Sequence, residues 1–243
     1  MKGRVLLVLF LLAGSSIAQV AAGRLEQTYA TATSSLVSAS DLSIPVRARK
    51  SFEKANALIQ KQEFREAIDK LNQAIAIYPA YSLAYNNLGV LYGRMGDQAR
   101  EREALQKAVS INNRLPLAYL NLGRMNVASG DFSAAEAALD QASKLDPGDP
   151  TALVLLSYAQ VMGGRFDEAI ATSRRAHVLP KYHAMVHTAA ARAFLRKGDA
   201  AGAAAELECF LKEQPSGPEA DSGRKELASL QATIDARRQT NPQ

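Results

Sequence analysis

The chain has 243 residues, of which 47% are hydrophobic and 6% are aromatic, and it contains one cysteine and no tryptophan. This apolar content suits a substantial core and argues against disorder over most of the chain, while a single cysteine excludes an internal disulfide. The formal charge of +5 is a mild excess of basic residues.

The first 18 residues have the pattern of a targeting segment. Lys2 and Arg4 precede an apolar run of nine residues, Val5–Ala13, and small residues follow up to Ala18. A run of nine is too short to span a bilayer, which takes about 20 residues. We therefore expect 1–18 to be a signal peptide, so that the mature protein is periplasmic or secreted. The alternative is an uncleaved membrane anchor.

Export changes the charge argument. Without the signal peptide, 27 Lys and Arg residues stand against 24 acidic residues, a formal charge of +3. This small excess, together with export, argues against a nucleic-acid partner. No cysteine follows the apolar run closely enough for lipid attachment, and no later stretch is apolar enough to cross a membrane.

Residues 19–44 are predicted to form a flexible arm or linker. The stretch 28–40 is rich in Ala, Thr and Ser and lacks helical periodicity. Leu42, Ile44 and Val46 alternate with polar residues or Pro. Two interpretations stay open, an extended segment that covers the first helix and a disordered one.

Helix pairs are predicted from residue 45 onward. Pro45 suits the first turn of a helix, where its missing N–H is not needed. Short turns, most of them Gly-Asp, separate the two helices of a pair, since Gly tolerates the left-handed conformation and Asp can cap the next helix. The predicted pairs are 45–61 with 64–77, 83–95 with 98–111, 117–129 with 132–145, 151–162 with 166–178, and 182–197 with 200–213.

The sequence repeats with a period of 34 residues and needs no insertion or deletion between 48 and 217. Stepping by 34 from Gln62 gives four glycines in succession, Gly96, Gly130, Gly164 and Gly198. Small residues share one column, Gly89, Gly123, Ser157 and Ala191, which should let the paired helices approach closely. The predicted organisation is a signal peptide at 1–18, an arm at 19–44, repeats at 48–81, 82–115, 116–149, 150–183 and 184–217, a capping helix at 218–237 and a tail at 238–243.

Two stretches identify the kind of repeat. Residues 85–92 read YNNLGVLY, residues 119–126 read YLNLGRMN, and spaced alanines, Leu139 and Pro147 close the second block. This pattern resembles the tetratricopeptide repeat. The resemblance implies an all-α solenoid of about five antiparallel helix pairs with a C-terminal capping helix. It also implies that the first helix of each pair lines a concave groove.

The sequence contains no motif for catalysis or for a cofactor. No nucleophile elbow, phosphate loop or HExxH pattern occurs. His183 and His187 are four residues apart, which can suit a metal, but no acid or cysteine lies close to them in sequence. His187 shares a column with Tyr85 and Tyr119, so we interpret it as a packing residue. We predict no enzyme, no cofactor and no metal site.

Asn87 and Asn121 share a column that in some tetratricopeptide families binds the backbone of a peptide. The resemblance implies that role here, and the alternative is that Asn is simply common in the repeat. The basic residues of the carboxylate clamp found in chaperone-binding relatives are absent, because Phe52 and Leu117 occupy two of their positions. We therefore do not expect binding of chaperone tails.

By the same resemblance, five columns of the first helices line the groove. Their 25 positions hold five Arg and no acid, whereas many acids lie on the second helices. Apolar residues with scattered guanidinium groups suit a protein or peptide segment that carries hydrophobic anchors and carboxylates. The predicted partner-binding residues are Asn87, Arg94, Asn121, Arg124, Tyr158, Arg192 and Arg196.

The predicted function is that of an exported, non-catalytic scaffold that binds an acidic-hydrophobic protein or peptide segment in its groove. One alternative is an envelope assembly factor, of the pilus or outer-membrane type. A further alternative is a periplasmic enzyme or metal-handling protein. Cys209 should be exposed, because the other residues of its column are polar.

Overall fold

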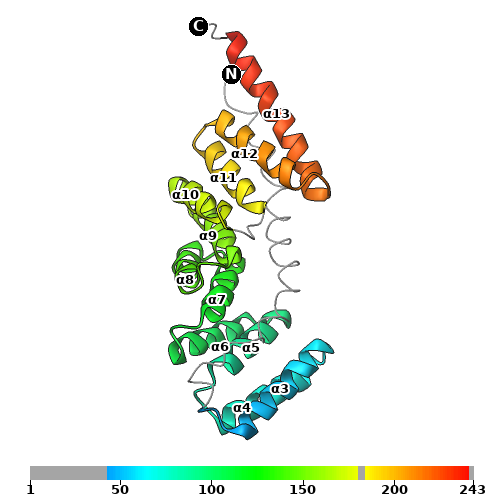
Figure 1. Ribbon diagram of the computed structural model, residues 1–243, viewed down its shortest axis with the longest axis vertical. Helices are drawn as coiled ribbons and strands as arrows, with labels where there is room; N and C mark the ends of the chain where they lie inside the picture. Colours follow the sequence, from blue (N-terminus) through cyan, green and yellow to red (C-terminus); the bar gives the residue numbers. More distant parts are fainter. Residues whose placement is uncertain (1–42, 180–183, 241–243) are drawn as a thin grey trace.

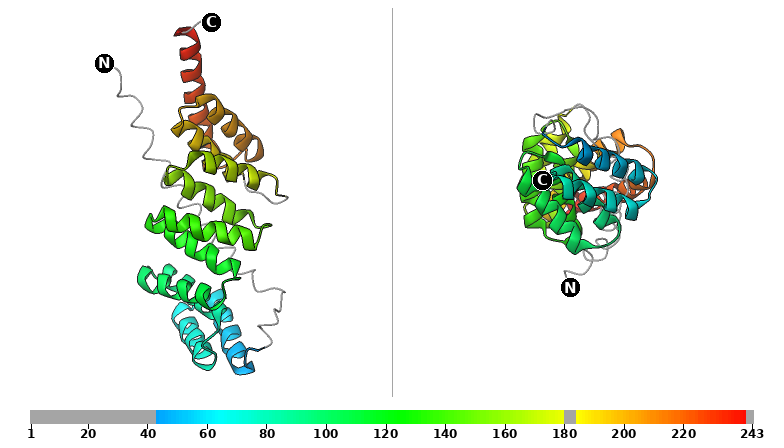
Figure 2. Two further views of the ribbon diagram at one scale, coloured as in Figure 1. Left: turned by 90° about the vertical axis from the view of Figure 1, so that its left-hand side faces the viewer. Right: turned by 90° about the horizontal axis from the view of Figure 1, so that it is seen from below.

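The computed structural model describes residues 43–179 and 184–240, so the predicted signal peptide and nearly all of the arm lie outside the described residues. The described part is all α-helical, with helices packed pairwise into one elongated stack (Figure 1). Seen along its length, the stack turns about a common axis (Figure 2). No helix in the described ranges has the length and apolarity that a membrane crossing requires.

Five pairs and one further helix make up the stack. The pairs are α3 (Val46–Gln60) with α4 (Phe64–Ile77), α5 (Ser82–Arg94) with α6 (Gln98–Ile111), α7 (Pro116–Ser129) with α8 (Phe132–Leu145), α9 (Pro150–Met162) with α10 (Phe166–His177), and α11 (Met185–Arg196) with α12 (Ala200–Glu213). The last helix is α13 (Pro218–Thr240). The all-α solenoid of five pairs with a capping helix is thus confirmed.

Most helix limits lie within one or two residues of those expected. Pro45 precedes α3 as its N-cap residue and does not lie in the first turn, whereas Pro116 and Pro150 do occupy first turns. The expected start of α11 at Tyr182 falls outside the described residues, and the helix is described from Met185. The capping helix continues past the expected end at Arg237.

The turn inside each pair has the conformation that its sequence favours. The four glycines of the period have φ between 77° and 80°, and Gln62 takes their place in the first pair with φ 62°. Asp97 then caps α6 by accepting a hydrogen bond from the backbone N–H of Arg100 at 3.0 Å. Asp131 and Asp199 cap their helices in the same way. Local sequence therefore sets where each second helix begins.

Small residues let the two helices of a pair come close together. A Cβ atom at Gly89 would lie 2.6 Å from Cγ of Leu105, and one at Gly123 would collide with Leu139. Both leucines are fully buried. The glycine column is therefore a packing requirement, because the neighbouring helix fills the space of the missing side chain.

The core is divided along the stack. One buried cluster extends from Ile44 to Ala104 and joins the first two pairs, and a second extends from Ala135 to Val186 over α8–α11. Ile44 is 7% exposed, whereas Val46 is 55% exposed, so the end of the arm packs on the first pair through one of its alternating apolar residues. Leu42 lies outside the described residues.

The helix α13 lies against α12 at the C-terminal end of the stack (Figure 1). Leu227, Leu230 and Ile234 are half-buried along one stripe, as their spacing predicts. Ala220 is fully buried. Cys209 is exposed, as predicted from its column, and burial together with the charges of Glu206 and Glu213 raises its pKa.

Candidate binding surface

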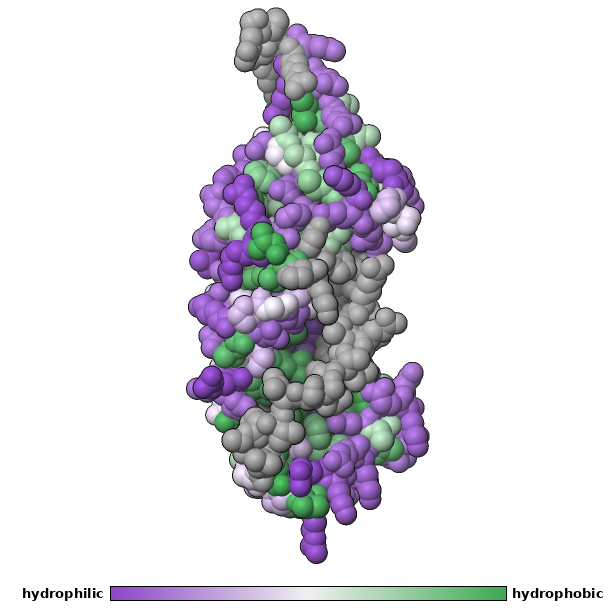
Figure 3. All heavy atoms as spheres, in the orientation of Figure 1, coloured by the Kyte–Doolittle hydropathy of each residue, from purple (hydrophilic) through white to green (hydrophobic). Residues whose placement is uncertain are grey.

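The first helices of successive pairs lie against one another. The helix α5 contacts α7, α7 contacts α9, and α9 contacts α11, and these contacts are more extensive than those between successive second helices. The first helices therefore form the inner side of the array and the second helices splay outward. Hydrophilic residues cover most of the face that Figure 3 shows, and hydrophobic residues appear there as small separate patches.

Arg94 and Arg196 make the same contact in two different repeats. The guanidinium carbon of Arg94 lies 5.4 Å from the ring centroid of Phe64, and that of Arg196 lies 5.4 Å from the ring centroid of Phe166. Each arginine ends a first helix and each phenylalanine begins the second helix of the preceding pair. Both arginines therefore help join neighbouring repeats by a cation–π contact.

Arg124 faces an acid that the groove columns did not include. Its Nη2 atom lies 3.9 Å from Oε1 of Glu101, whose side chain is only 9% exposed. Glu101 belongs to α6 and stands in the column where Ala67, Ala135 and Ala169 occur. Burial raises the pKa of Glu101, and the charges of Arg124 and Arg102 offset that effect only in part. A carboxylate thus reaches the predicted acid-free surface from a second helix.

Gly93 provides the space that Glu101 occupies. A Cβ atom at Gly93 would lie 2.5 Å from Oε1 and 2.7 Å from Cδ of Glu101. Other repeats carry a larger apolar residue in the Gly93 column, such as Val127 or Val161, opposite an alanine. In the second repeat the small residue is therefore on the first helix and the large one, Glu101, on the second helix, whereas the other repeats have the reverse arrangement.

Arg192 interacts electrostatically with Tyr158 of α9 and with Glu226 of the capping helix. Burial lowers the pKa of Arg192, and the opposing charges around it are those of Tyr158 and Glu226. Tyr158 is 9% exposed. Burial raises the pKa of Glu226, with Arg192 acting in the opposite direction. A second carboxylate thus reaches the first helices, in this case from α13.

The asparagines form a hydrogen-bonded ladder along the first helices. Nδ2 of Asn121 donates to Oδ1 of Asn86 at 2.8 Å, Asn86 donates to Asn87 at 3.1 Å, and Asn87 donates to Asn56 at 3.0 Å. Asn121 is 1% exposed, whereas Asn87 is half-buried. The amide of Asn121 therefore links repeats inside the array, and Asn87 is the more accessible of the two predicted residues.

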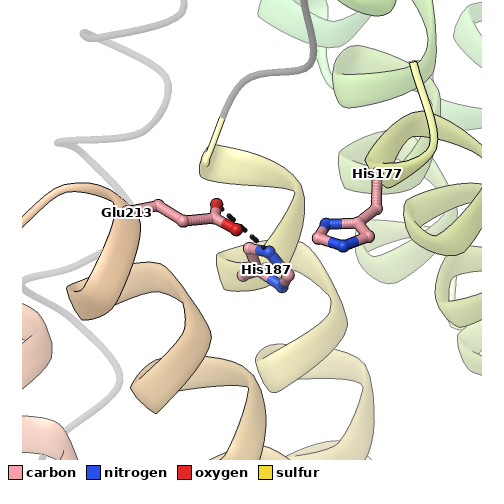
Figure 4. Close-up of side chains that lie close together, drawn as sticks. All are labelled: His177, His187 and Glu213. Atoms are coloured by element: carbon pink, nitrogen blue, oxygen red, sulfur yellow. Dashed lines mark ion pairs between the residues drawn. The ribbon is translucent and has the colours of Figure 1, made fainter. Parts of the chain in front are cut away.

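Folding also brings acids to His187, which the sequence argument missed because they are distant in sequence. Nδ1 of His187 lies 2.8 Å from Oε2 of Glu206, and its Nε2 lies 3.3 Å from Oε2 of Glu213. The ring of His177 is 5.0 Å away, centroid to centroid (Figure 4). Burial lowers the pKa of His187, but the hydrogen bond to Glu206 and the charges of both acids outweigh it and raise the pKa overall.

A pocket of about 570 Å³ opens between α5 and α6. Tyr85, Tyr92 and Lys107 are among the residues that line it. The guanidinium carbon of Arg100 lies 4.6 Å from the ring centroid of Tyr92 and forms part of the wall. The sequence columns did not indicate this pocket, because α6 was assigned to the outer side.

Comparison with known proteins supports the repeat assignment. A model of the TPR repeat matches residues 55–96, and two models of the tetratricopeptide repeat match residues 83–114 and 126–176. Curated proteins gave no match.

Solved structures with the same fold include several repeat proteins. YrrB, described as a TPR protein with an unusual peptide-binding site, superposes with a TM-score of 0.65 at 18% identity, covering 86% of this chain and 99% of YrrB. The MamA protein gives 0.64 at 21% identity, covering 70% and 92%. A tetratricopeptide repeat protein from Parabacteroides merdae gives 0.67 at 16% identity, covering 81% and 77%. At these identities the likeness concerns the fold alone.

Proposed function

We propose that this chain, which matches models of the tetratricopeptide repeat over 55–114 and 126–176, is a non-catalytic scaffold that binds a protein or peptide segment on the inner side of its array. YrrB, which has the same fold, is described as having a peptide-binding site. The observation that carries the proposal is the continuous series of contacts between α5, α7, α9 and α11, which aligns their side chains on one side.

The bound segment is proposed to be acidic and hydrophobic. Arg124 and Arg192 are half-buried on the first helices, where guanidinium groups bind carboxylates more strongly than in water. Arg124 already faces Glu101, and Arg192 already faces Glu226. Burial raises the pKa of both acids. An incoming carboxylate would add to or replace that partner, and apolar residues such as Leu120 and Val154 would accept its hydrophobic anchors.

The proposal also includes export. Its support is the basic start of the sequence and the apolar run Val5–Ala13 before small residues. Its test is the N-terminal sequence of the mature protein recovered from a periplasmic extract. Cleavage after Ala18 is the expected result, and an intact Met1 would contradict it.

A displayed peptide library tests the binding proposal. Wild-type protein should enrich peptides that combine Asp or Glu with Leu or Phe, and added salt should weaken their binding because the arginines are only partly buried. A variant with Arg124→Gln and Arg192→Gln should lose this enrichment. Glutamine is chosen because charge reversal would place a like charge beside Glu101 or Glu226.

The matched control is Arg175→Gln, which removes an exposed arginine from the outer helix α10. This control should bind the selected peptides as wild type does, and circular dichroism should be the same for all three proteins. Enrichment of the same peptides by the double variant would show that the first-helix surface is not the binding site. Enrichment of basic peptides would reject the proposed ligand chemistry.

A further inference from the structure

Three side chains with metal-binding groups converge at one end of the last two pairs. His177 is the last residue of α10, Glu213 is the last residue of α12, and His187 lies in the first turn of α11. One potential ligand atom from each lies within 4.8 Å of the other two (Figure 4). The three residues come from three different helices, so the fold places them together and local sequence does not.

The other repeats serve as an internal comparison for these positions. From the second repeat to the fourth, the columns of His187 and Glu213 hold only apolar or aromatic residues, and the first repeat has Ser51 in the His187 column. The column of His187 contains Tyr85, Tyr119 and Leu153, and the column of Glu213 contains Ile77, Ile111, Leu145 and Leu179. One repeat earlier, Leu153 and Leu179 belong to the same hydrophobic cluster. Packing alone is therefore satisfied by apolar residues at this place.

His177 and Glu206, which lie beside these two residues, stand in columns of mixed character. His177 stands in a column with Ile75, Val109, Ser143 and Leu211, and Glu206 stands in a column with Lys70, Ala104, Ala138 and Thr172. The two departures from largely apolar columns, His187 and Glu213, thus meet two further polar side chains in one place. A histidine in a core column needs partners that an apolar residue does not, so the group acts as a unit.

The distances suit a small divalent ion. In a tetrahedral zinc site with bonds of about 2.0–2.1 Å, ligand atoms are roughly 3.3 Å apart. Nε2 of His187 and Oε2 of Glu213 are separated by 3.3 Å. His177 is exposed at the end of its helix and approaches from the opposite side of the His187 ring. One of its ring nitrogens lies within 4.8 Å of the ligand atoms of His187 and Glu213.

The second nitrogen of His187 has the environment that metal-binding histidines require. Glu206 lies 2.8 Å from Nδ1, so it can accept the Nδ1–H hydrogen and leave the lone pair of Nε2, on the side of Glu213, for a metal ion. A carboxylate behind a ligating histidine fixes the tautomer and the ring orientation. His187 is 6% exposed, so the ring is also held by packing.

We propose that His177, His187 and Glu213 bind one divalent transition-metal ion of the zinc class, with Glu206 as the positioning residue for His187. Two imidazoles and one carboxylate leave a coordination position open to water or to a side chain of a bound protein. Imidazole ligands favour Zn²⁺, Ni²⁺ or Cu²⁺ over Mg²⁺ or Ca²⁺. The ion would link the fourth repeat to the fifth, because α10 belongs to one and α11 and α12 to the other.

Calorimetric titration of the chelator-treated full chain with Zn²⁺ tests the proposal. Wild type should bind one Zn²⁺ per chain, Mg²⁺ should not compete, and Co²⁺ should give the visible absorption of a four- or five-coordinate site. His187→Leu and Glu213→Leu should each weaken binding at least about tenfold. Both should fold, because leucine occupies the same columns one repeat earlier.

Further variants separate ligands from supporting groups. Glu206→Gln still accepts the Nδ1–H hydrogen and should weaken binding less than Glu206→Thr, and the Co²⁺ spectrum should shift in both. Glu208→Gln, an exposed acid on the same helix, should bind as wild type does. If His187→Leu fails to fold, the exposed His177→Ala decides the question. Absence of saturable Zn²⁺ binding, or equal binding by the ligand variants and wild type, would overturn the proposal.

Discussion

Two neighbouring interfaces in this array are built from different chemistry on the same 34-residue frame. Between the second and third pairs, Asn121 donates to Asn86, Arg124 faces Glu101, and Arg102 donates to Asn126 at 3.1 Å. Between the third and fourth pairs, the positions equivalent to Asn86 and Asn121 hold Leu120 and Leu155, which pack in an apolar cluster. We refer to these as the polar interface and the apolar interface.

The comparison separates what the repeat requires from what it tolerates. All three pairs keep the left-handed turn, and the second and third keep the glycine and the buried leucine of the second helix, which the fourth replaces by Ser157 and Ser173. The residues between first helices can be either amides or leucines, provided that both partners match. A buried amide without a partner costs about 1–3 kcal/mol, whereas a matched pair is nearly neutral. Matching, more than polarity, is therefore the constraint.

Leu139→Ala should produce the largest effect, because Leu139 is fully buried beside the apolar interface and fills the space next to Gly123. We expect the free energy of unfolding to fall by about 2–5 kcal/mol. Urea titration followed by circular dichroism measures it. Ile77→Ala, at a residue that is 43% exposed, is the control and should lose less. A loss at Leu139 below that of the control would contradict the packing argument.

Asn121→Leu should destabilise the polar interface by about 1–3 kcal/mol, because Oδ1 of Asn86 then lacks a donor in a buried place. Adding Asn86→Leu should recover most of the loss, since the pair then matches Leu120 and Leu155 of the apolar interface. Urea titration of both single variants and the double variant gives the coupling energy. Purely additive losses would mean that the two amides do not act as a pair.

Gly96→Ala and Gly164→Ala should lower the free energy of unfolding equally. Gly96 lies in the turn of the second pair, which forms the polar interface, and Gly164 in the turn of the fourth pair, which forms the apolar interface. Both glycines have φ near 78°, within about 1°, and an added Cβ atom meets nothing within 4 Å. The cost is therefore backbone strain alone, about 1 kcal/mol in each case. Thermal unfolding of the two variants checks this. A clear difference between them would show that the turns, as well as the interfaces, differ.

Glu101→Gln should have the smallest effect and a defined dependence on pH. Burial raises the pKa of Glu101 above its ordinary value of 4.5, so the folded chain binds this proton more tightly than the unfolded chain. The free energy of unfolding of wild type therefore falls as pH rises from 4.5 through the folded-state pKa. The variant lacks this fall, so its stability relative to that of wild type should be higher at neutral pH than at acid pH.

Urea titrations at several pH values measure this difference, with Glu103→Gln as a control at an exposed position on the same helix. The control should parallel wild type at every pH. The opposite result would be a loss of stability in Glu101→Gln, relative to wild type, that is larger at neutral pH than at acid pH. It would mean that the ion pair with Arg124 outweighs the cost of burying the carboxylate, and that the sign of our argument is wrong.

The fold was predictable because each of its determinants is local or periodic. The left-handed glycine, the capping aspartate and the spaced alanines recur at intervals of 34 residues. The assignment of each helix is therefore supported by the other repeats even where one repeat departs from the pattern. The starts of α6, α8 and α12 follow directly from the glycine and the capping aspartate. The start of α3 shows the limit of the method, because Pro45 can precede a helix as readily as begin it.

The candidate surface was less predictable because its electrostatics depend on contacts between columns. Sorting residues by first and second helix gave an acid-free groove, yet Glu101 reaches Arg124 from a second helix into the space left by Gly93. Glu226 reaches Arg192 from α13, which does not belong to the period. The departure of Glu101 from an alanine column was visible in the sequence, and it was the one signal that could have indicated a buried acid.

The asparagine pair also bears on the order in which repeats assemble. If the fourth pair docked on the second and the third looped out, Leu155 would meet Asn86, and a buried amide would have no partner. Such skipping is a hazard for any chain made of similar units, because each unit offers its neighbours nearly the same face. A single matched amide pair penalises that error, much as one buried asparagine fixes the alignment of a coiled coil. The hydrogen-bonded pair of Asn86 and Asn121 thus makes the docking of the third repeat on the second specific, because no other two successive repeats have asparagine at both of these positions.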